Sequence, residues 1–138
     1  MNTTSPVAGR PGEGFALQAD QDSYDFGTRA KATIAPAWRN EVTMSSLEAI
    51  LEYAPGRFID LVAPRPLLMI LARNDAIVPP DSIRQAFVRA GTPKRLLEIE
   101  GGHYSVYTGP GAEAAQAAAE WFTEHLLHAK SAATTSAR

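Results

Sequence analysis

Two short segments in the second half of the chain have the pattern of buried strands. Residues 67–72 read LLMILA, apolar without alternation, and residues 94–100 read KRLLEIE. Both begin after a proline and end at a loop of polar residues or glycines. A short apolar run like the first is typical of a strand that is buried on both faces of a parallel sheet, whereas a buried helix needs a longer run. We therefore predict two strands here.

Helical patterns surround the two strands. Residues 81–90 carry apolar positions on one face, with Asp81 as the predicted cap and Gly91 as the stop. Residues 112–127 form an amphipathic pattern, and residues 45–54 begin with SSLE, which has capping-box spacing. A strand–helix–strand unit is parallel and right-handed in nearly every known case. The predicted fold class is therefore α/β.

The remaining segments are less regular. Residues 1–14 mix Pro, Gly, Ser and Thr, which predicts an irregular lead-in. Residues 15–44 add scattered aromatic and aliphatic positions, and we interpret them as short helices or loops that form the remnant of a lid. Residues 45–128 form the α/β segment, and residues 129–138 are small and polar, which predicts a disordered tail.

Composition narrows the class of protein. The 138 residues are 45% apolar and 20% charged, as in one ordinary globular domain, and they contain no cysteine for disulfides, thiolate metal sites or a cysteine nucleophile. The net charge of −2, with acidic and basic residues interspersed, predicts neither a nucleic-acid nor a membrane partner. With no signal-peptide pattern and no membrane-length apolar run, we expect a cytoplasmic location.

The candidate chemistry lies just beyond the two predicted strands. Asp75 ends the loop RND after the first strand, and His103 ends the loop GGH after the second. Adjacent strands lie about 4.8 Å apart, so side chains three places beyond two neighbouring strand ends can form a hydrogen bond. An acid followed by a histidine in this order matches the last two members of a Ser…Asp…His triad. In such a triad His103 is the base and Asp75 orients it.

The nucleophile of that triad is missing. No serine lies in a G-x-S-x-G elbow. Ser45 and Ser46 are expected to cap a helix, Ser82 opens another, and Ser105 follows His103 too closely to be its partner. We therefore expect the chain alone to be inactive.

A metal site and two purely structural roles are the competing interpretations. Taken singly, Asp75 is more often a loop-opening residue and His103 a surface histidine; only their joint placement favours catalysis. Four side chains are of a type that could ligate a divalent metal, namely Asp75, Asp81, Glu100 and His103. A single imidazole without a second at ligand spacing argues against that site. We predict no metal and no cofactor.

The same loops carry a resemblance to a known family. Residues 66–79, PLLMILARNDAIVP, and residues 101–104, GGHY, are similar to the acid and histidine segments of the α/β-hydrolase superfamily. The resemblance covers roughly residues 15–128. It implies the C-terminal portion of a doubly wound α/β-hydrolase sheet, with the last two parallel strands and their flanking helices. It also implies Asp75 as the acid and His103 as the base, acting on esters, thioesters or small amides.

Further segments suggest a finer placement. Residues 12–17, residues 38–42 and the helix from Ser46 are similar to bacterial dienelactone-hydrolase-like and Xaa-Pro-peptidase-like members. Nothing matches the nucleophile elbow or the oxyanion-hole loop. The simplest account is a C-terminal fragment of a serine hydrolase that acts on a small-molecule ester or amide.

The alternative is a non-catalytic α/β fragment or interaction module. Two strands bury little surface and leave an unpaired edge, so we expect either a homo-oligomer or association with a missing N-terminal half. A segment carrying G-x-S-x-G, encoded upstream or on a partner chain, distinguishes the two hypotheses.

Overall fold

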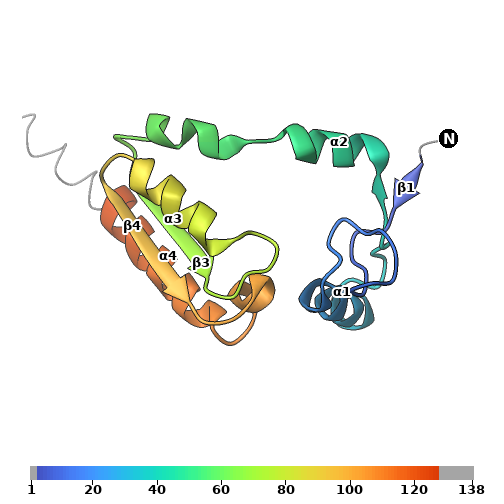
Figure 1. Ribbon diagram of the computed structural model, residues 1–138. Helices are drawn as coiled ribbons and strands as arrows, with labels where there is room; N and C mark the ends of the chain where they lie inside the picture. The colour runs from blue at the N-terminus through green and yellow to red at the C-terminus, as the bar shows by residue number, and fades with distance from the viewer. Residues whose placement is uncertain (1–2, 128–138) are drawn as a thin grey trace, which may run out of the picture. The chain divides into compact units, whose positions relative to one another are not determined.

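The computed structural model describes residues 3–127, which divide into two compact units at Pro55 (Figure 1). The sequence pattern predicts this division at residue 45, near the start of the helix α2 (Met44–Glu52). In the structure α2 belongs to the first unit, because it packs against the strand β2 (Val42–Thr43) that directly precedes it. The two units are described separately below.

The first unit contains a helix of 13 residues in a segment where the sequence pattern indicates short helices or loops. α1 (Gln21–Thr33) lies within the segment interpreted as an irregular lid remnant. Asp20 caps it, accepting a hydrogen bond from the N–H of Ser23 at 2.9 Å. The buried positions of α1 are Ser23 and Gly27, and a Cβ at Gly27 would lie 3.1 Å from the Trp38 ring. Because small residues rather than large apolar ones face inward, the helix shows no apolar stripe in the sequence.

The predicted irregular lead-in also contains ordered structure. β1 (Thr4–Ser5) pairs antiparallel with β2. Asn40 fixes the backbone at Ala8. Its side chain donates to the carbonyl of Ala8 at 2.7 Å and accepts from the N–H of Ala8 at 2.8 Å. These pairings join distant positions, so local composition does not reveal them.

The helix predicted at residues 45–54 is α2, and its cap differs from the prediction. Thr43 is the cap and accepts from the N–H of Ser46 at 3.2 Å, while Ser45 and Ser46 lie inside the first turn. Leu47 is the buried residue of this helix. The predicted cap thus lies two residues too late, because threonine and serine satisfy the same role.

The second unit confirms the predicted strand–helix–strand unit. β3 (Leu67–Ala72) and β4 (Lys94–Ile99) are parallel and pair in register from one end to the other, and α3 (Pro80–Arg89) connects them (Figure 1). The 3₁₀ helix η1 (Pro55–Leu61) precedes β3, and Arg89 of α3 donates to the carbonyl of Gly56 within it.

The two strands lie between helices. Ala72 and Ile99 form the core with Ala114 of α4 (Gly111–Phe122), together with half-buried neighbours of the same strands. Side chains alternate between the two faces of a strand, so Glu98 points the other way and binds Arg84 of α3. Helices α4 and α3 therefore cover opposite faces of the sheet.

Both helices differ from their predicted limits. α3 begins with Pro80 in its first turn, and Asp81 does not cap it but pairs with Arg84 at 2.8 Å. Proline suits this position because its missing N–H would be unpaired there in any case. α4 ends at Phe122 and continues as one π-helical turn, η3 (Thr123–Leu127). The predicted tail at 129–138 lies outside the described residues.

Lys94 fastens the end of α3 to the start of β4. Its ammonium group donates to the carbonyls of Phe87, Val88 and Ala90 at 2.6, 3.1 and 2.7 Å. These carbonyls belong to the last turn of the helix or follow it, where they lack partners within the helix and carry partial negative charge. A single side chain thus satisfies three acceptors.

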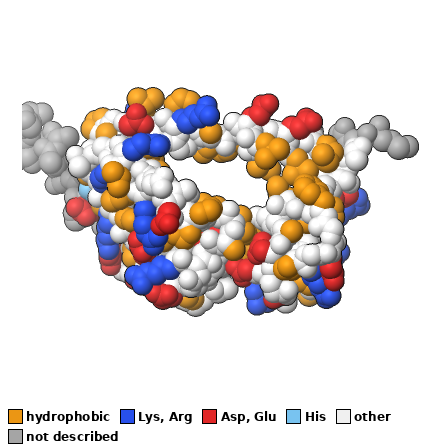
Figure 2. All heavy atoms as spheres, in the orientation of Figure 1, with side chains coloured by type: hydrophobic (Ala, Val, Ile, Leu, Met, Phe, Trp, Pro, Cys, Tyr) orange, Lys and Arg blue, Asp and Glu red, His pale blue; other side chains and the backbone are white. Residues whose placement is uncertain are grey.

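The surface is mixed in charge and partly apolar. On the face shown in Figure 2, acidic and basic side chains are interspersed. Exposed apolar residues of the second unit include Phe58, Leu61 and Val88. Among residues 3–127, no helix has the length and apolar character needed to cross a bilayer.

One edge of β3 is unpaired within the described residues. β3 pairs with β4 alone in its sheet, so Leu67 to Ile70 are half-buried rather than fully buried as predicted, whereas Leu71 and Ala72 are buried. The N–H groups of Leu67 and Arg73 point toward β4. Because successive residues point to opposite sides of a strand, the N–H of Leu68 points to the unpaired side.

We expect the chain to self-associate through this edge, since unpaired strand groups are a template for pairing. Leu68→Pro removes an outward N–H without removing a bond to β4, so it should shift light scattering toward the monomer. Met69→Pro is the matched control, because it removes an inward N–H and should unfold the sheet. Equal scattering from the wild type and Leu68→Pro would contradict self-association through β3.

Candidate active site

The acid loop continues the sheet for two residues before it turns. The N–H of Arg73 donates to the carbonyl of Ile99, and the N–H of Asn74 donates to the carbonyl of Gly101, both at 3.0 Å. The next residue is Asp75, whose N–H lies 3.4 Å from the carbonyl of Ala72 in a tight turn. These bonds bring Asp75 alongside the loop that carries the histidine.

Both carboxylate oxygens of Asp75 are engaged. Oδ1 accepts from the N–H groups of Ile77 and Val78, each at 2.8 Å. Such side-chain bonds to the backbone two or three residues later are a local turn that aspartate forms readily. With Oδ1 held, Oδ2 points at His103 and lies 2.9 Å from its Nδ1.

The histidine loop depends on glycine. Gly101 has a φ of +106°, and a Cβ at this position would lie 2.0 Å from the Oγ of Ser105. A residue with a side chain therefore fits neither the backbone conformation nor the space. The 3₁₀ helix η2 (His103–Tyr107) follows directly, and the Tyr104 ring packs edge-on against the His103 ring at 4.9 Å between centroids.

The hydrogen bonds around Asp75 favour its charged carboxylate. Burial acts to raise the pKa of the Asp75 carboxyl group, whose side chain is only 12% exposed, but its hydrogen bonds outweigh this effect. The N–H of Val78, the His103 ring and the N–H of Ile77 lower the pKa of that group below 3.8. An ionised carboxylate only accepts hydrogen bonds, so Nδ1 carries the proton in this contact, and the tautomer that the contact selects has its lone pair on Nε2.

A pocket of about 210 Å³ adjoins the pair. Asp75 and His103 line it, and the remaining walls include the apolar side chains of Val78, Val106 and Tyr107. The last three residues of β3 also line the pocket, which places it at the carboxyl end of that strand. Apolar side chains beside Asp75 and His103 lower the local polarity and so strengthen the electrostatic interaction between them.

The other candidate side chains have different partners. Asp81 and Glu100 pair with arginines and do not join Asp75 and His103. Within residues 3–127, no three residues of the types His, Cys, Asp and Glu are grouped to hold a metal. Ser82 donates to the carbonyl of Pro79 at 2.7 Å, and Ser105 lies beside Gly101.

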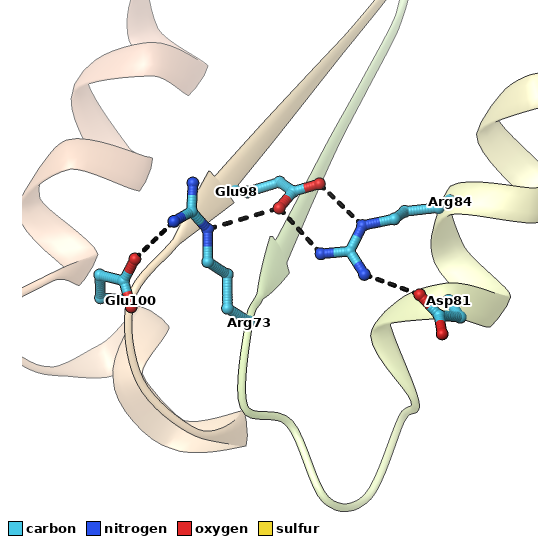
Figure 3. Close-up of polar contacts among 5 residues, drawn as sticks. All are labelled: Arg73, Asp81, Arg84, Glu98 and Glu100. Atoms are coloured by element: carbon cyan, nitrogen blue, oxygen red, sulfur yellow. Dashed lines mark hydrogen bonds and ion pairs between the residues drawn. The ribbon is translucent and has the colours of Figure 1, made fainter.

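A cluster of five charged residues lies next to the site, and the sequence pattern did not lead us to expect it (Figure 3). Arg84 binds both oxygens of Glu98, at 2.9 and 2.8 Å, and Arg73 lies 3.4 Å from the same carboxylate. The hydrogen bond from Arg84 is the main cause of the lowered pKa of Glu98, with Arg73 contributing. Arg73 also donates to Glu100 at 2.7 Å.

The sequence shows the charges of this cluster, and the strand register brings them together. Glu98 and Glu100 are two apart at the end of β4, so they share a face, and Arg73 lies at the end of the neighbouring strand. Opposite charges that face each other across two paired strands attract. In the sequence, Arg73 stands out only as part of the acid loop, and Glu100 only as a metal ligand.

Comparisons with known proteins agree with this fold. No protein-family model matches the chain. The polyketide transferase claH of Penicillium crustosum is 26% identical over 103 residues, which are 72% of this chain and 33% of that protein. The crystal structure of the α/β hydrolase GrgF from Penicillium sp. sh18 matches with a TM-score of 0.72 and 16% identity. The structure of DcsB in complex with its substrate analogue matches with a TM-score of 0.73 and 24% identity.

These likenesses define the fold of the chain. Both structural matches cover 91% of this chain but only 43% and 44% of the other proteins. The chain therefore has the α/β-hydrolase fold over part of a hydrolase domain, and it spans about a third of the length of the curated relative. The finer placement near dienelactone-hydrolase-like or Xaa-Pro-peptidase-like proteins stays a prediction.

The lowered pKa of Asp75 predicts how stability depends on pH. The ionised carboxylate stabilises the fold fully above its ordinary pKa of 3.8, and this contribution is lost as the pH falls through the lower pKa of the folded state. Asp75→Asn should lower the free energy of unfolding at pH 7 by about 1.5–3 kcal/mol. It should also reduce the loss of stability that the wild type shows as the pH falls through the pKa of Asp75. Urea unfolding at a series of pH values measures both effects.

Asp81→Asn is the matched control, because Asp81 is exposed and pairs with Arg84 at the surface. It should change the free energy of unfolding by less than about 1 kcal/mol. If both variants change the dependence of the free energy of unfolding on acid pH to the same extent, the hydrogen bonds of Asp75 do not stabilise the fold as proposed.

Proposed function

We propose that this chain supplies the acid and the histidine of a serine hydrolase, with Asp75 orienting His103. One observation carries the proposal. Nδ1 of His103 lies 2.9 Å from Oδ2 of Asp75, while the second oxygen of that carboxylate is held by two backbone N–H groups. A surface histidine or a simple turn aspartate has no need of this arrangement.

The geometry defines the role of each group. As a serine Oγ attacks the acyl carbon of an ester, Nε2 of His103 takes the hydroxyl proton. The imidazolium then gives this proton to the leaving alkoxide, and the bond between the acyl carbon and that oxygen breaks. Asp75 keeps its negative charge throughout and stabilises the imidazolium. In the second half, Nε2 takes a proton from a water molecule whose oxygen attacks the acyl carbon. The bond between the acyl carbon and Oγ then breaks, Nε2 returns the proton to Oγ, and the carboxylic acid leaves.

The serine of this mechanism lies outside the 138 residues, since none of them belongs to a G-x-S-x-G elbow. The unpaired edge of β3 and the adjoining pocket offer a position for this serine. The pocket is lined by the last residues of β3 as well as by His103, so it adjoins both the strand and the base. We propose that a neighbouring strand pairs with this edge and that the elbow after it reaches the pocket. Both belong either to the same polypeptide or to a partner chain.

The substrate class follows from the chemistry of the pair and the apolar pocket. Esters, thioesters and small amides all pass through an acyl-serine that needs this base. That intermediate reacts with water, which gives hydrolysis, or with another nucleophile, which gives transfer. The name of the curated relative, a polyketide transferase, is the reason to include acceptor alcohols in the assay.

A non-catalytic interaction module is the second candidate. The missing elbow in the sequence favours it, and so does the unpaired edge of β3 within the described residues. The coding sequence around this chain distinguishes the two candidates. A G-x-S-x-G elbow in frame, or on an adjacent gene, supports the hydrolase.

The functional prediction compares the chain alone with the chain produced together with that elbow-bearing segment. Alone, it should hydrolyse p-nitrophenyl acetate no faster than His103→Ala, because a base without a nucleophile has nothing to activate. Together, the two segments should turn over the ester, and Asp75→Asn should lower kcat by about 10⁴, the loss that the same substitution causes in a serine protease triad. Asp81→Asn is the control and should leave kcat within about twofold.

Two results would refute this assignment. The first is an unchanged kcat for Asp75→Asn in the active assembly. The second is turnover by the chain alone that a fluorophosphonate blocks by labelling one of its own serines. That outcome would place the nucleophile within these 138 residues.

A further inference from the structure

Few backbone contacts hold the acid loop to the histidine loop. Two hydrogen bonds, from Arg73 to Ile99 and from Asn74 to Gly101, extend the pairing of the strands into the loops. Beyond them, Asp75 and His103 meet through their side chains. The residues between Glu100 and His103 are both glycine, so they have no side chains with which to hold this stretch of chain. The separation of the pair therefore depends on how firmly the residues just before it are held.

The guanidinium of Arg73 bridges the two loops at that point. Its Nη1 donates to Oε1 of Glu100 at 2.7 Å, and its Nε lies 3.4 Å from Oε2 of Glu98 (Figure 3). Arg73 is two residues before Asp75, and Glu100 is three before His103. One planar group thus ties together the starts of both loops, and the rigid fork of arginine suits contact with two carboxylates.

The anchor at Glu98 is itself fixed. Arg84 binds both oxygens of Glu98, and Asp81 lies 2.8 Å from the same guanidinium (Figure 3). Arg84 therefore fastens β4 to α3, and its partners lie outside the two loops. Arg73 and Arg84 carry the same charge and share Glu98, and they differ in that Arg73 reaches the start of the histidine loop.

The exposure of Arg73 indicates that its contacts matter less for the stability of the fold than for the geometry of the site. Its side chain is 52% exposed and that of Glu100 is 71% exposed, so the pair adds little to overall stability. The position of a catalytic pair is more sensitive, since a misplacement of about 1 Å costs about 10² in rate. A contact that is weak in stability can therefore matter for geometry.

We propose that Arg73 is a positioning residue, which holds the acid loop against the histidine loop and so keeps Asp75 in hydrogen-bond contact with His103. This proposal rests on the proposed function, because the contact has a catalytic purpose only if the pair belongs to a triad. It requires no ligand and no second chain.

The test follows the Nδ1–H proton of His103 in the full chain by ¹⁵N-edited NMR, with the signal assigned from His103→Ala. Arg73→Gln should raise the rate at which this proton exchanges with water by about tenfold, because the pair opens more often. Arg84→Gln should leave that rate within about twofold, although it should lower the thermal midpoint of unfolding at least as much as Arg73→Gln does. Arg73→Lys should give an intermediate rate, since one ammonium group reaches a single carboxylate.

The outcomes separate this proposal from the function on which it rests. If the wild type and Asp75→Asn give the same exchange, the Asp75–His103 pair does not exist, and both proposals fail. If those two differ but Arg73→Gln behaves like the wild type, only the role of Arg73 is refuted. The same holds if Arg84→Gln raises the rate as much as Arg73→Gln. Should Arg73→Gln not fold, Glu100→Gln removes the same bridge and must raise the exchange rate.

Discussion

The register between β3 and β4 is the constraint on which the site depends. Leu67 lies opposite Lys94, and Ala72 lies opposite Ile99, so the two strands end at the same level. A slip of one residue would move one loop by about 3.3 Å relative to the other, which exceeds the tolerance of a hydrogen bond. It would also turn Ile99, which is 1% exposed, away from the core. Packing of a single isoleucine thus helps to set the distance between a carboxylate and an imidazole.

The two faces of the small sheet use different interactions. On the α4 side, Ala72 and Ile99 pack against Ala114 in an apolar core. On the α3 side, the buried Leu71 lies opposite Glu98 of the neighbouring strand, and two arginines compensate the charge of Glu98. An ion-pair cluster of this kind is directional, whereas apolar packing is not. The ion-pair cluster therefore fixes orientation at the strand ends, where orientation matters for the site.

Local pattern predicted the elements whose signal is strong and contiguous. The run LLMILA and the loops that end at Asp75 and His103 sufficed to predict the parallel pair and the contact between acid and histidine. The limits of α1 were not predicted because its inward residues are small, and the cap of α3 was misassigned because Asp81 has an arginine one turn later. The contacts of Arg73 depend on strand register, which a single sequence does not display. Errors therefore arise where the inward residues are small, where a local ion pair competes with a cap, and where a contact depends on strand register.

The crossover helix is fastened to β4 near both of its ends. Arg84 binds Glu98 near the carboxyl end of the strand, and Lys94 at the other end binds the carbonyls that close α3. The strand, the helix and the next strand thus form one braced unit that carries the acid and the histidine together. For protein engineering, this unit can be treated as one segment to be moved as a whole. We expect residues 67–107, moved as a block together with α4, which packs on Ala72 and Ile99, to keep the contact between Asp75 and His103.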